Sequence, residues 1–261
     1  MLVPTMTLKE LHRTVFADER WIDDKLDAAV VEFKRVVLKA HLFPVKRKYT
    51  YTCHNSNITY TFYLRAYRRA QWHNPNFSVI TTYSHEGGTT LVVLDTVNKH
   101  LFINTPHMLA RIRERYMNDE SCSTQQVIDF LMDNYGFAST GNIHIMKDEK
   151  NKYDHENSDY FAVVTPLGVF FCEQEKDYVD VTVFNTYLPQ EMLRKEQNRK
   201  IAIEYFKVYC EEYMKRNATN AEIVKKQYEQ LILTSTLEHW SIDKFIDESN
   251  KYMDEHPLYV I

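Results

Sequence analysis

Apolar residues recur three or four positions apart within residues 7–41, and this spacing predicts helical structure. Thr7 is followed three residues later by Glu10, which is the pattern of a capping box at a helix N-terminus. The next segment places one set of side chains on a single helical face: Trp21, Leu26, Ala29, Val30, Phe33, Val36 and Val37. Pro44 closes the helical region, since proline cannot continue a helix.

The pattern then changes to alternation with a period of two, which predicts β-strands. Within residues 58–69, Tyr60, Phe62, Leu64 and Ala66 alternate with a second set of side chains on the opposite face. The other expected strands cover residues 48–53, 77–83, 89–96 and 101–104. Turn-forming residues separate the first two pairs of strands. Residues 1–97 are therefore expected to form an N-terminal subdomain of helices and antiparallel strands.

Helical signals return at Thr105-Pro106, where a capping threonine precedes a proline at the first helical position. Helices are expected to Met117 and over residues 124–134, and strands over residues 142–147, 160–165, 169–173 and 179–187. Residues 98–189 thus predict a helix–helix–four-strand antiparallel core. Residues 190–261 predict a C-terminal helical arm. The fold class is α+β, in one domain or in closely packed subdomains.

Composition narrows the classes of function. Only five of 261 residues are glycine, which argues against a glycine-rich phosphate-binding loop. The net charge is −4, so nucleic-acid binding would require a local positive patch. The four cysteines form no CxxC pair, and we expect reduced thiols, no metal and no cofactor. No signal peptide or membrane-spanning segment is evident, so we expect a cytoplasmic protein without membrane association.

The segment 104–116 contains the strongest candidates for catalytic and phosphate-binding residues. On the predicted helix, His107, Arg111 and Glu114 or Arg115 share one face, because residues four apart are neighbours. Met108, Ile112 and Tyr116 form another stripe, which is expected to face the core. A histidine can transfer a proton near neutral pH, and arginines can hold phosphate oxygens. A solvated helix face with local ion pairs is the alternative interpretation.

The run from His107 to Arg115, followed by helix and strands in this order, resembles the barnase–EndoU–colicin–RelE group of small ribonucleases. The resemblance is to phage-associated members and covers about residues 98–193. It implies metal-independent cleavage of RNA through attack by the 2′-hydroxyl. His107 would be the general acid or base, and Arg111 and Arg115 would bind phosphate. Thr186 or Tyr187, from the last strand, would hydrogen-bond the phosphate.

Further basic residues are candidates for substrate binding. Arg113 lies in the same run, and Arg65 and Arg68 belong to a cluster with Tyr63, Tyr67, Arg69 and Trp72. Arginine and aromatic side chains can stack on bases, although they also serve at strand ends and protein interfaces. A metal site at His85 and His100 would have an incomplete ligand set, and a hairpin turn is the preferred interpretation.

Two functions are left open by the sequence. One is the ribonuclease described above, with RNA as partner. The other is a non-enzymatic interaction or assembly module that uses the aromatic-rich sheet or the C-terminal helices to bind a protein.

Overall fold

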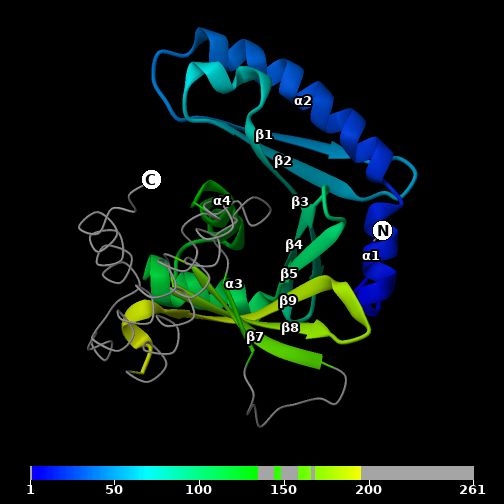
Figure 1. Cartoon of the computed structure of the whole chain (residues 1–261), viewed down its shortest axis with the longest axis vertical. Coiled ribbons are helices and arrows are strands. Elements are labelled where there is room, and N and C mark those ends of the chain that lie inside the picture. Colours follow the sequence, from blue (N-terminus) through cyan, green and yellow to red (C-terminus); the bar gives the residue numbers. More distant parts are fainter. Residues whose placement is uncertain (1, 135–143, 148–157, 166–167, 195–261) are drawn as a thin grey trace, which may run out of the picture. The chain divides into compact units, whose positions relative to one another are not determined.

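The computed structural model describes residues 2–134, 144–147, 158–165 and 168–194 (Figure 1). The predicted C-terminal helical arm lies outside these residues, apart from a short 3-10 turn, η3, at Gln190–Met192. The chain divides into two compact units. The first contains Met1–Gly141, Lys152–Tyr160 and Cys172–Thr186, and the second contains the remaining residues.

The N-terminal elements follow the predicted order. They are α1 (Leu8–Phe16), α2 (Glu19–Lys39), β1 (Val45–Thr52), β2 (Thr59–Ala66), η1 (Arg69–His73), β3 (Asn76–His85), β4 (Gly88–Asp95) and β5 (His100–Asn104). The capping box is confirmed, because the Glu10 backbone N–H donates to Thr7 Oγ1 (3.2 Å) and the Thr7 N–H donates to the Glu10 carboxylate (2.8 Å).

The second half begins with two helices separated by a π-helical turn. The elements are α3 (Pro106–Ile112), η2 (Arg113–Met117, π-helical), α4 (Thr124–Asn134), β6 (His144–Lys147), β7 (Ser158–Thr165), β8 (Gly168–Glu175) and β9 (Tyr178–Pro189). The strands form one hydrogen-bonded sheet in the order β1-β2-β3-β4-β5-β9-β8-β7-β6. The expected α+β class with a mostly antiparallel sheet is confirmed.

The pairing of β9 differs from the expected separate four-stranded sheet. This strand pairs in parallel with β5, in a register that runs from Leu101↔Val181 to Asn104↔Phe184. Leu101 and Ile103 on β5 are buried, and β9 contributes the buried Val181 to the same apolar cluster. The second partner of β5, on the side opposite β4, is therefore a strand about 80 residues away in the sequence, which local patterning does not reveal.

Two apolar clusters of described residues pack α1 and α2 on strands of the first unit. One joins Leu11 and Val15 of α1 to buried side chains of β2–β5 and to Val181. In the other, Ala29, Phe33 and Val37 of α2 pack with Val45, Leu64 and Ala66 of β1 and β2. Figure 1 shows α2 running along these two strands. The i, i+4 spacing on the helix and the period of two on the strands put these residues on facing sides.

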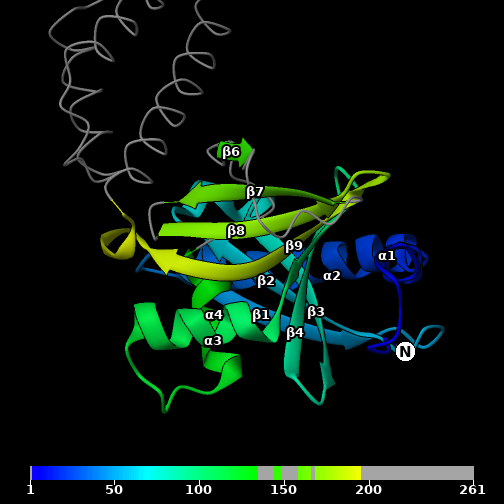
Figure 2. The same ribbon diagram turned by 90° about the horizontal axis from the view of Figure 1, so that it is seen from below.

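Helices α3 and α4 contact one another, as Figure 2 shows. Their buried residues are Met108, Leu109 and Ile112 on α3, and Val127, Ile128, Leu131 and Met132 on α4. Tyr116 was expected to continue the buried stripe of α3, but its side chain is 42% exposed. The reason is the π-helical turn, whose wider spacing shifts the side chains that follow Ile112.

The described part of the second unit contains strand segments. β6 pairs antiparallel with β7, from His144↔Val164 to Lys147↔Phe161. Phe170 and Tyr187 pack with their ring centroids 5.1 Å apart. Gly168 has φ +140°, and a Cβ there would overlap the Leu188 carbonyl.

Candidate functional site

The start of α3 is attached to the end of β9. Thr105 caps the helix, with its Oγ1 accepting a hydrogen bond from the Met108 backbone N–H (3.2 Å). Its backbone N–H donates to the Phe184 carbonyl (3.2 Å), and its hydroxyl lies within hydrogen-bond distance of the Phe184 and Asn185 carbonyls (3.2 and 3.1 Å). The chain segments that carry His107 and Thr186 are therefore neighbours in the first unit.

His107, Arg111 and Glu114 form a connected set on the exposed side of this helix. Arg111 Nε donates to His107 Nε2 at 3.4 Å, and Arg111 Nη1 donates to Glu114 Oε2 at 2.5 Å. The predicted i, i+4 neighbourhood of His107 and Arg111 is confirmed. The short ion pair orients the guanidinium, whereas the contact to the imidazole is long and therefore weak.

Arg113 and Arg115, the other arginines of the run from His107 to Arg115, lie on the π-helical turn η2. Arg113 Nη2 donates to Thr124 Oγ1 at 2.8 Å, so its side chain lies against the start of α4. Its Nε is buried and lacks a hydrogen-bond partner. Arg115 is partly buried within the same turn. Turns of this type are rare and are frequent at functional sites, which draws attention to the segment.

The two candidates on the last strand, Thr186 and Tyr187, differ in burial. Thr186 is partly buried and follows Asn185, whose side-chain amide donates to Glu173 on β8 at 3.0 Å. Tyr187 belongs to the second unit and is fully buried. The sequence did not predict the contact between Glu173 and Asn185. Polar residues that alternate along a strand look the same in the sequence as residues on an ordinary solvent-exposed face.

Gly88 and Asn104 lie close to the start of α3, which carries His107. Gly88 has φ +116°, and a Cβ there would lie 3.1 Å from Pro106 Cβ, so the β3–β4 hairpin packs closely on the start of α3. Asn104 is completely buried directly before the Thr105 cap, and its Oδ1 has no hydrogen-bond partner. A buried polar atom of this kind is uncommon in folded proteins.

The cluster that was predicted around Arg65 and Arg68 is divided by the fold. Arg65 is only 4% exposed and donates to the Met132 carbonyl and to Ser78 Oγ (3.1 Å). Arg68 is exposed at the N-terminal end of η1, next to Tyr67, which is 52% exposed. Arg68 therefore lies at the surface, whereas Arg65 is part of the interior.

His85 and His100 lie at opposite ends of β4. His85 pairs with Gly88 at one end of the strand, and His100 pairs with Asp95 at the other. His100 Nε2 is 2.9 Å from Thr182 Oγ1, and burial lowers the pKa of the His100 imidazole. Among the described residues, no group of three or more His, Cys, Asp or Glu side chains is arranged to hold a metal ion.

Comparison with known proteins finds no matching family model, no matching curated protein and no matching solved structure. Within the described residues, no helix is both long enough and apolar enough to cross a membrane.

Proposed function

We propose that this chain is a metal-independent endoribonuclease with His107 as its proton-transfer group and Arg111 as its phosphate-binding group. The observation that carries the proposal is the contact of the Arg111 guanidinium with the His107 imidazole on an exposed helix face. The attachment of Thr105 to β9 supports it, because residues preceding Thr186 then lie beside the start of the helix.

In the proposed reaction, His107 Nε2 accepts the proton of an RNA 2′-hydroxyl. The 2′-oxygen forms a bond to phosphorus while the bond from phosphorus to the 5′-oxygen breaks, and water supplies a proton to that leaving oxygen. Arg111 binds the non-bridging oxygens and stabilises the charge that develops on them. The products are a 2′,3′-cyclic phosphate and a 5′-hydroxyl end.

The other motif residues have secondary parts in this proposal. Glu114 orients Arg111 through their 2.5 Å ion pair, and Arg115 adds positive charge from the adjoining π-helical turn. Thr186 directly follows Asn185, whose carbonyl lies beside the Thr105 hydroxyl, and is the β9 hydroxyl assigned to the phosphate, whereas Tyr187 is fully buried. Arg113 maintains the connection to α4 through Thr124.

The test is cleavage of a fluorescent RNA by the purified full chain in the presence of EDTA. We expect cyclic-phosphate products by mass spectrometry, and a loss of rate of about 100-fold or more in His107→Ala, which is the usual contribution of general acid–base catalysis. His54→Ala is the matched control, because His54 is an exposed histidine on the β1–β2 connection. Cleavage that is unchanged in His107→Ala, or absent from the wild-type chain, would refute the proposal.

A further inference from the structure

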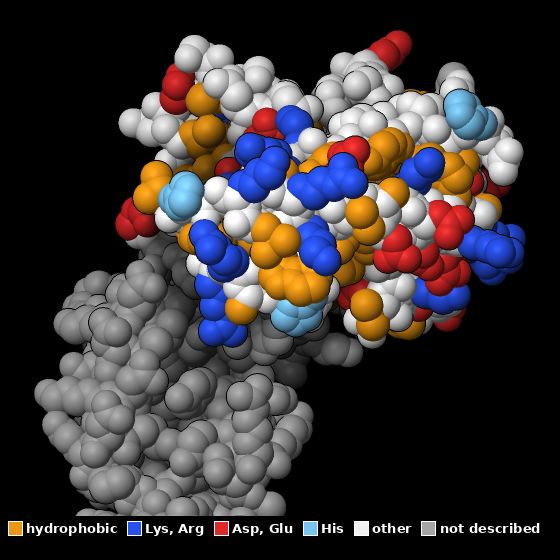
Figure 3. All heavy atoms as spheres, turned by 90° about the horizontal axis from the view of Figure 1, so that it is seen from above, with side chains coloured by type: hydrophobic (Ala, Val, Ile, Leu, Met, Phe, Trp, Pro, Cys, Tyr) orange, Lys and Arg blue, Asp and Glu red, His pale blue; other side chains and the backbone are white. Residues whose placement is uncertain are grey.

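Helix α2 divides into an acidic half and a basic half. Residues 18–32 contain six Asp or Glu and two Lys or Arg, whereas residues 34–48 contain six Lys or Arg and no acidic residue. Figure 3 shows basic side chains gathered on one part of this side of the molecule and acidic ones on another. The macrodipole favours basic residues in the last turn of a helix, but it gives no reason for the basic residues on β1.

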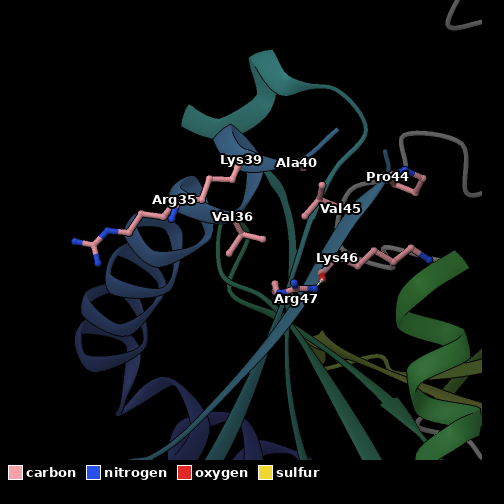
Figure 4. A pocket seen from close by; sticks show the side chains of 8 residues that line it. All are labelled: Arg35, Val36, Lys39, Ala40, Pro44, Val45, Lys46 and Arg47. Atoms are coloured by element: carbon pink, nitrogen blue, oxygen red, sulfur yellow. Dashed lines mark hydrogen bonds between the residues drawn. The ribbon is translucent and has the colours of Figure 1, made fainter. Parts of the chain in front are cut away.

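The basic residues surround a shallow depression between the end of α2 and the start of β1. Its volume is about 540 Å³, within the range of small-molecule sites, and it is lined by Arg35, Val36, Lys39, Ala40, Pro44, Val45, Lys46 and Arg47. Figure 4 shows Val36 and Val45 facing one another, with Lys39 on the last turn of α2 and Arg47 on β1. The floor is therefore apolar, and Lys39 and Arg47 lie at its edge, whereas the Arg35 side chain is directed away from the two valines.

Several of these cations lack an acidic partner. Lys46 and Lys48 form ion pairs with Asp133 and Asp129 on α4. Arg35, Lys39, Arg47 and Arg68 form no ion pair within the part of the chain that the structure describes. Arg69 donates to the Ala40 carbonyl at 2.8 Å, which places η1, with Arg68 before it, beside the end of α2.

Aromatic side chains accompany the cations. The Lys34 ammonium lies 3.9 Å from the centre of the Trp72 ring, and Tyr67 is 52% exposed next to Arg68. Separated cations around an apolar floor, with an exposed aromatic ring nearby, match the alternation of phosphates and bases in a single strand of nucleic acid. A bilayer is flat and contacts protruding side chains, so it would leave the depression unfilled.

We infer that Lys39, Arg47, Arg35 and Arg68, here called the α2–β1 basic surface, bind single-stranded RNA. Their cations contact the phosphates and the apolar floor receives a base. The choice of RNA as the ligand rests on the proposed ribonuclease function, but binding at this surface does not require cleavage.

The test uses a fluorescent 12-nucleotide 2′-O-methyl RNA, which lacks the attacking hydroxyl and so cannot be consumed. Binding is measured by fluorescence anisotropy between 50 and 300 mM KCl. In Lys39→Gln/Arg47→Gln we expect the slope of log affinity against log salt to become shallower by about 1.4, because each lost phosphate contact on a single strand removes about 0.7. Affinity at 50 mM KCl should fall roughly tenfold or more.

The matched control is Arg13→Gln/Arg20→Gln, which removes the same charge from exposed positions on α1 and α2. Arg68→Gln supplies an independent variant on a different element. An unchanged slope in the α2–β1 variants, or an equal change in the control, overturns the inference. Unchanged RNA binding with a loss of binding to vesicles of phosphatidylserine and phosphatidylcholine would assign the surface to lipid and would also overturn it.

The two proposals fail separately. If the wild-type chain binds the 2′-O-methyl RNA through this surface and leaves ordinary RNA intact, the ribonuclease proposal fails and the binding surface stands. If ordinary RNA is cleaved equally well by Lys39→Gln/Arg47→Gln, and its salt slope for the 2′-O-methyl RNA equals that of the wild type, the surface fails and the ribonuclease proposal stands.

Discussion

The two faces of the β1–β2 ribbon hold their helices by different means. Under α2 the contacts are apolar, with Phe33 and Val37 packed on Leu64. Under α4 they are polar: Tyr63 and Lys48 donate to Asp129, Lys46 pairs with Asp133, and Arg65 donates to the Met132 carbonyl. One period-two alternation generates both faces, because Lys46↔Arg65 and Lys48↔Tyr63 are cross-strand pairs on the same side.

Apolar contacts and hydrogen bonds contribute differently to the position of a helix. The free energy of apolar burial is roughly proportional to the buried area and has no preferred direction, so it tolerates small rotations of a helix. Hydrogen bonds require aligned donors and acceptors, so Gln125, Asp129 and Asp133, which are spaced four residues apart on α4, fix the rotation of that helix. We expect the α2 face to dominate stability and the α4 face to respond to pH and salt.

The largest effect is expected on the α2 face. Phe33 is fully buried, and Phe33→Ala should reduce the free energy of unfolding by about 3–5 kcal/mol, since it removes apolar contacts and leaves a cavity. Denaturant titration measures this loss. Val31→Ala, at a 58% exposed position of the same helix, should change stability by less than about 0.5 kcal/mol. Equal effects of the two substitutions would contradict the assignment of the core face.

An intermediate effect is expected from Tyr63→Phe, which removes the 2.5 Å hydrogen bond to Asp129. The loss should be about 1.5–3 kcal/mol, the range for hydrogen bonds to charged groups. Burial raises the pKa of Asp129, but hydrogen bonds from Tyr63, Gln125 and Lys48 outweigh it and leave the pKa below its ordinary value.

The sign of the pH dependence follows from that direction. The stability contributed by Asp129 is present above the unfolded pKa of about 3.9 and is lost as the pH falls through the lower folded value, because the unfolded chain then binds more protons. Unfolding titrations from pH 3 to pH 7 should show a smaller acid loss in Tyr63→Phe than in the wild type. An identical acid loss in both proteins would show that Tyr63 does not lower this pKa.

The smallest effect is expected from Lys46→Gln. Its ion pair with Asp133 spans 3.0 Å, and both side chains are about two-fifths exposed, at 41% and 39%. Exposed pairs contribute about 0.2–1 kcal/mol and are screened by salt. A double-mutant cycle with Asp133→Asn should give a coupling energy in this range that declines at 1 M NaCl. A coupling energy that salt leaves unchanged would place the pair in a less solvated setting than its exposure indicates.

Local patterns in the sequence predicted much of the fold but little of its long-range pairing. The capping box at Thr7, the alternation around Phe62 and the Thr105-Pro106 helix start each depend on neighbours within a few residues, and all appear in the structure. The parallel pairing of β5 with β9 depends on which strand edge is left open after the chain has folded.

In the candidate site too, local contacts could be predicted from the sequence and long-range contacts could not. The contact of His107 with Arg111 follows from helical spacing. The burial of Arg65 does not, because an arginine on an alternating strand is expected to be exposed until Ser78 and the Met132 carbonyl are known to receive its hydrogen bonds. The π-helical turn after Ile112 has no recognisable local signal and redirects the residues that follow it.

The parallel pairing of β5 with β9 also constrains the order in which the protein can assemble during synthesis. The β1–β5 meander can form soon after residue 104 leaves the ribosome, because each strand pairs with the one before it. Its last edge, with Leu101 and Ile103, then waits until residues 181–184 emerge. A ribosome that stalls in this interval would present an unpaired apolar strand to other chains, so we expect slow elongation through residues 105–184 to favour aggregation.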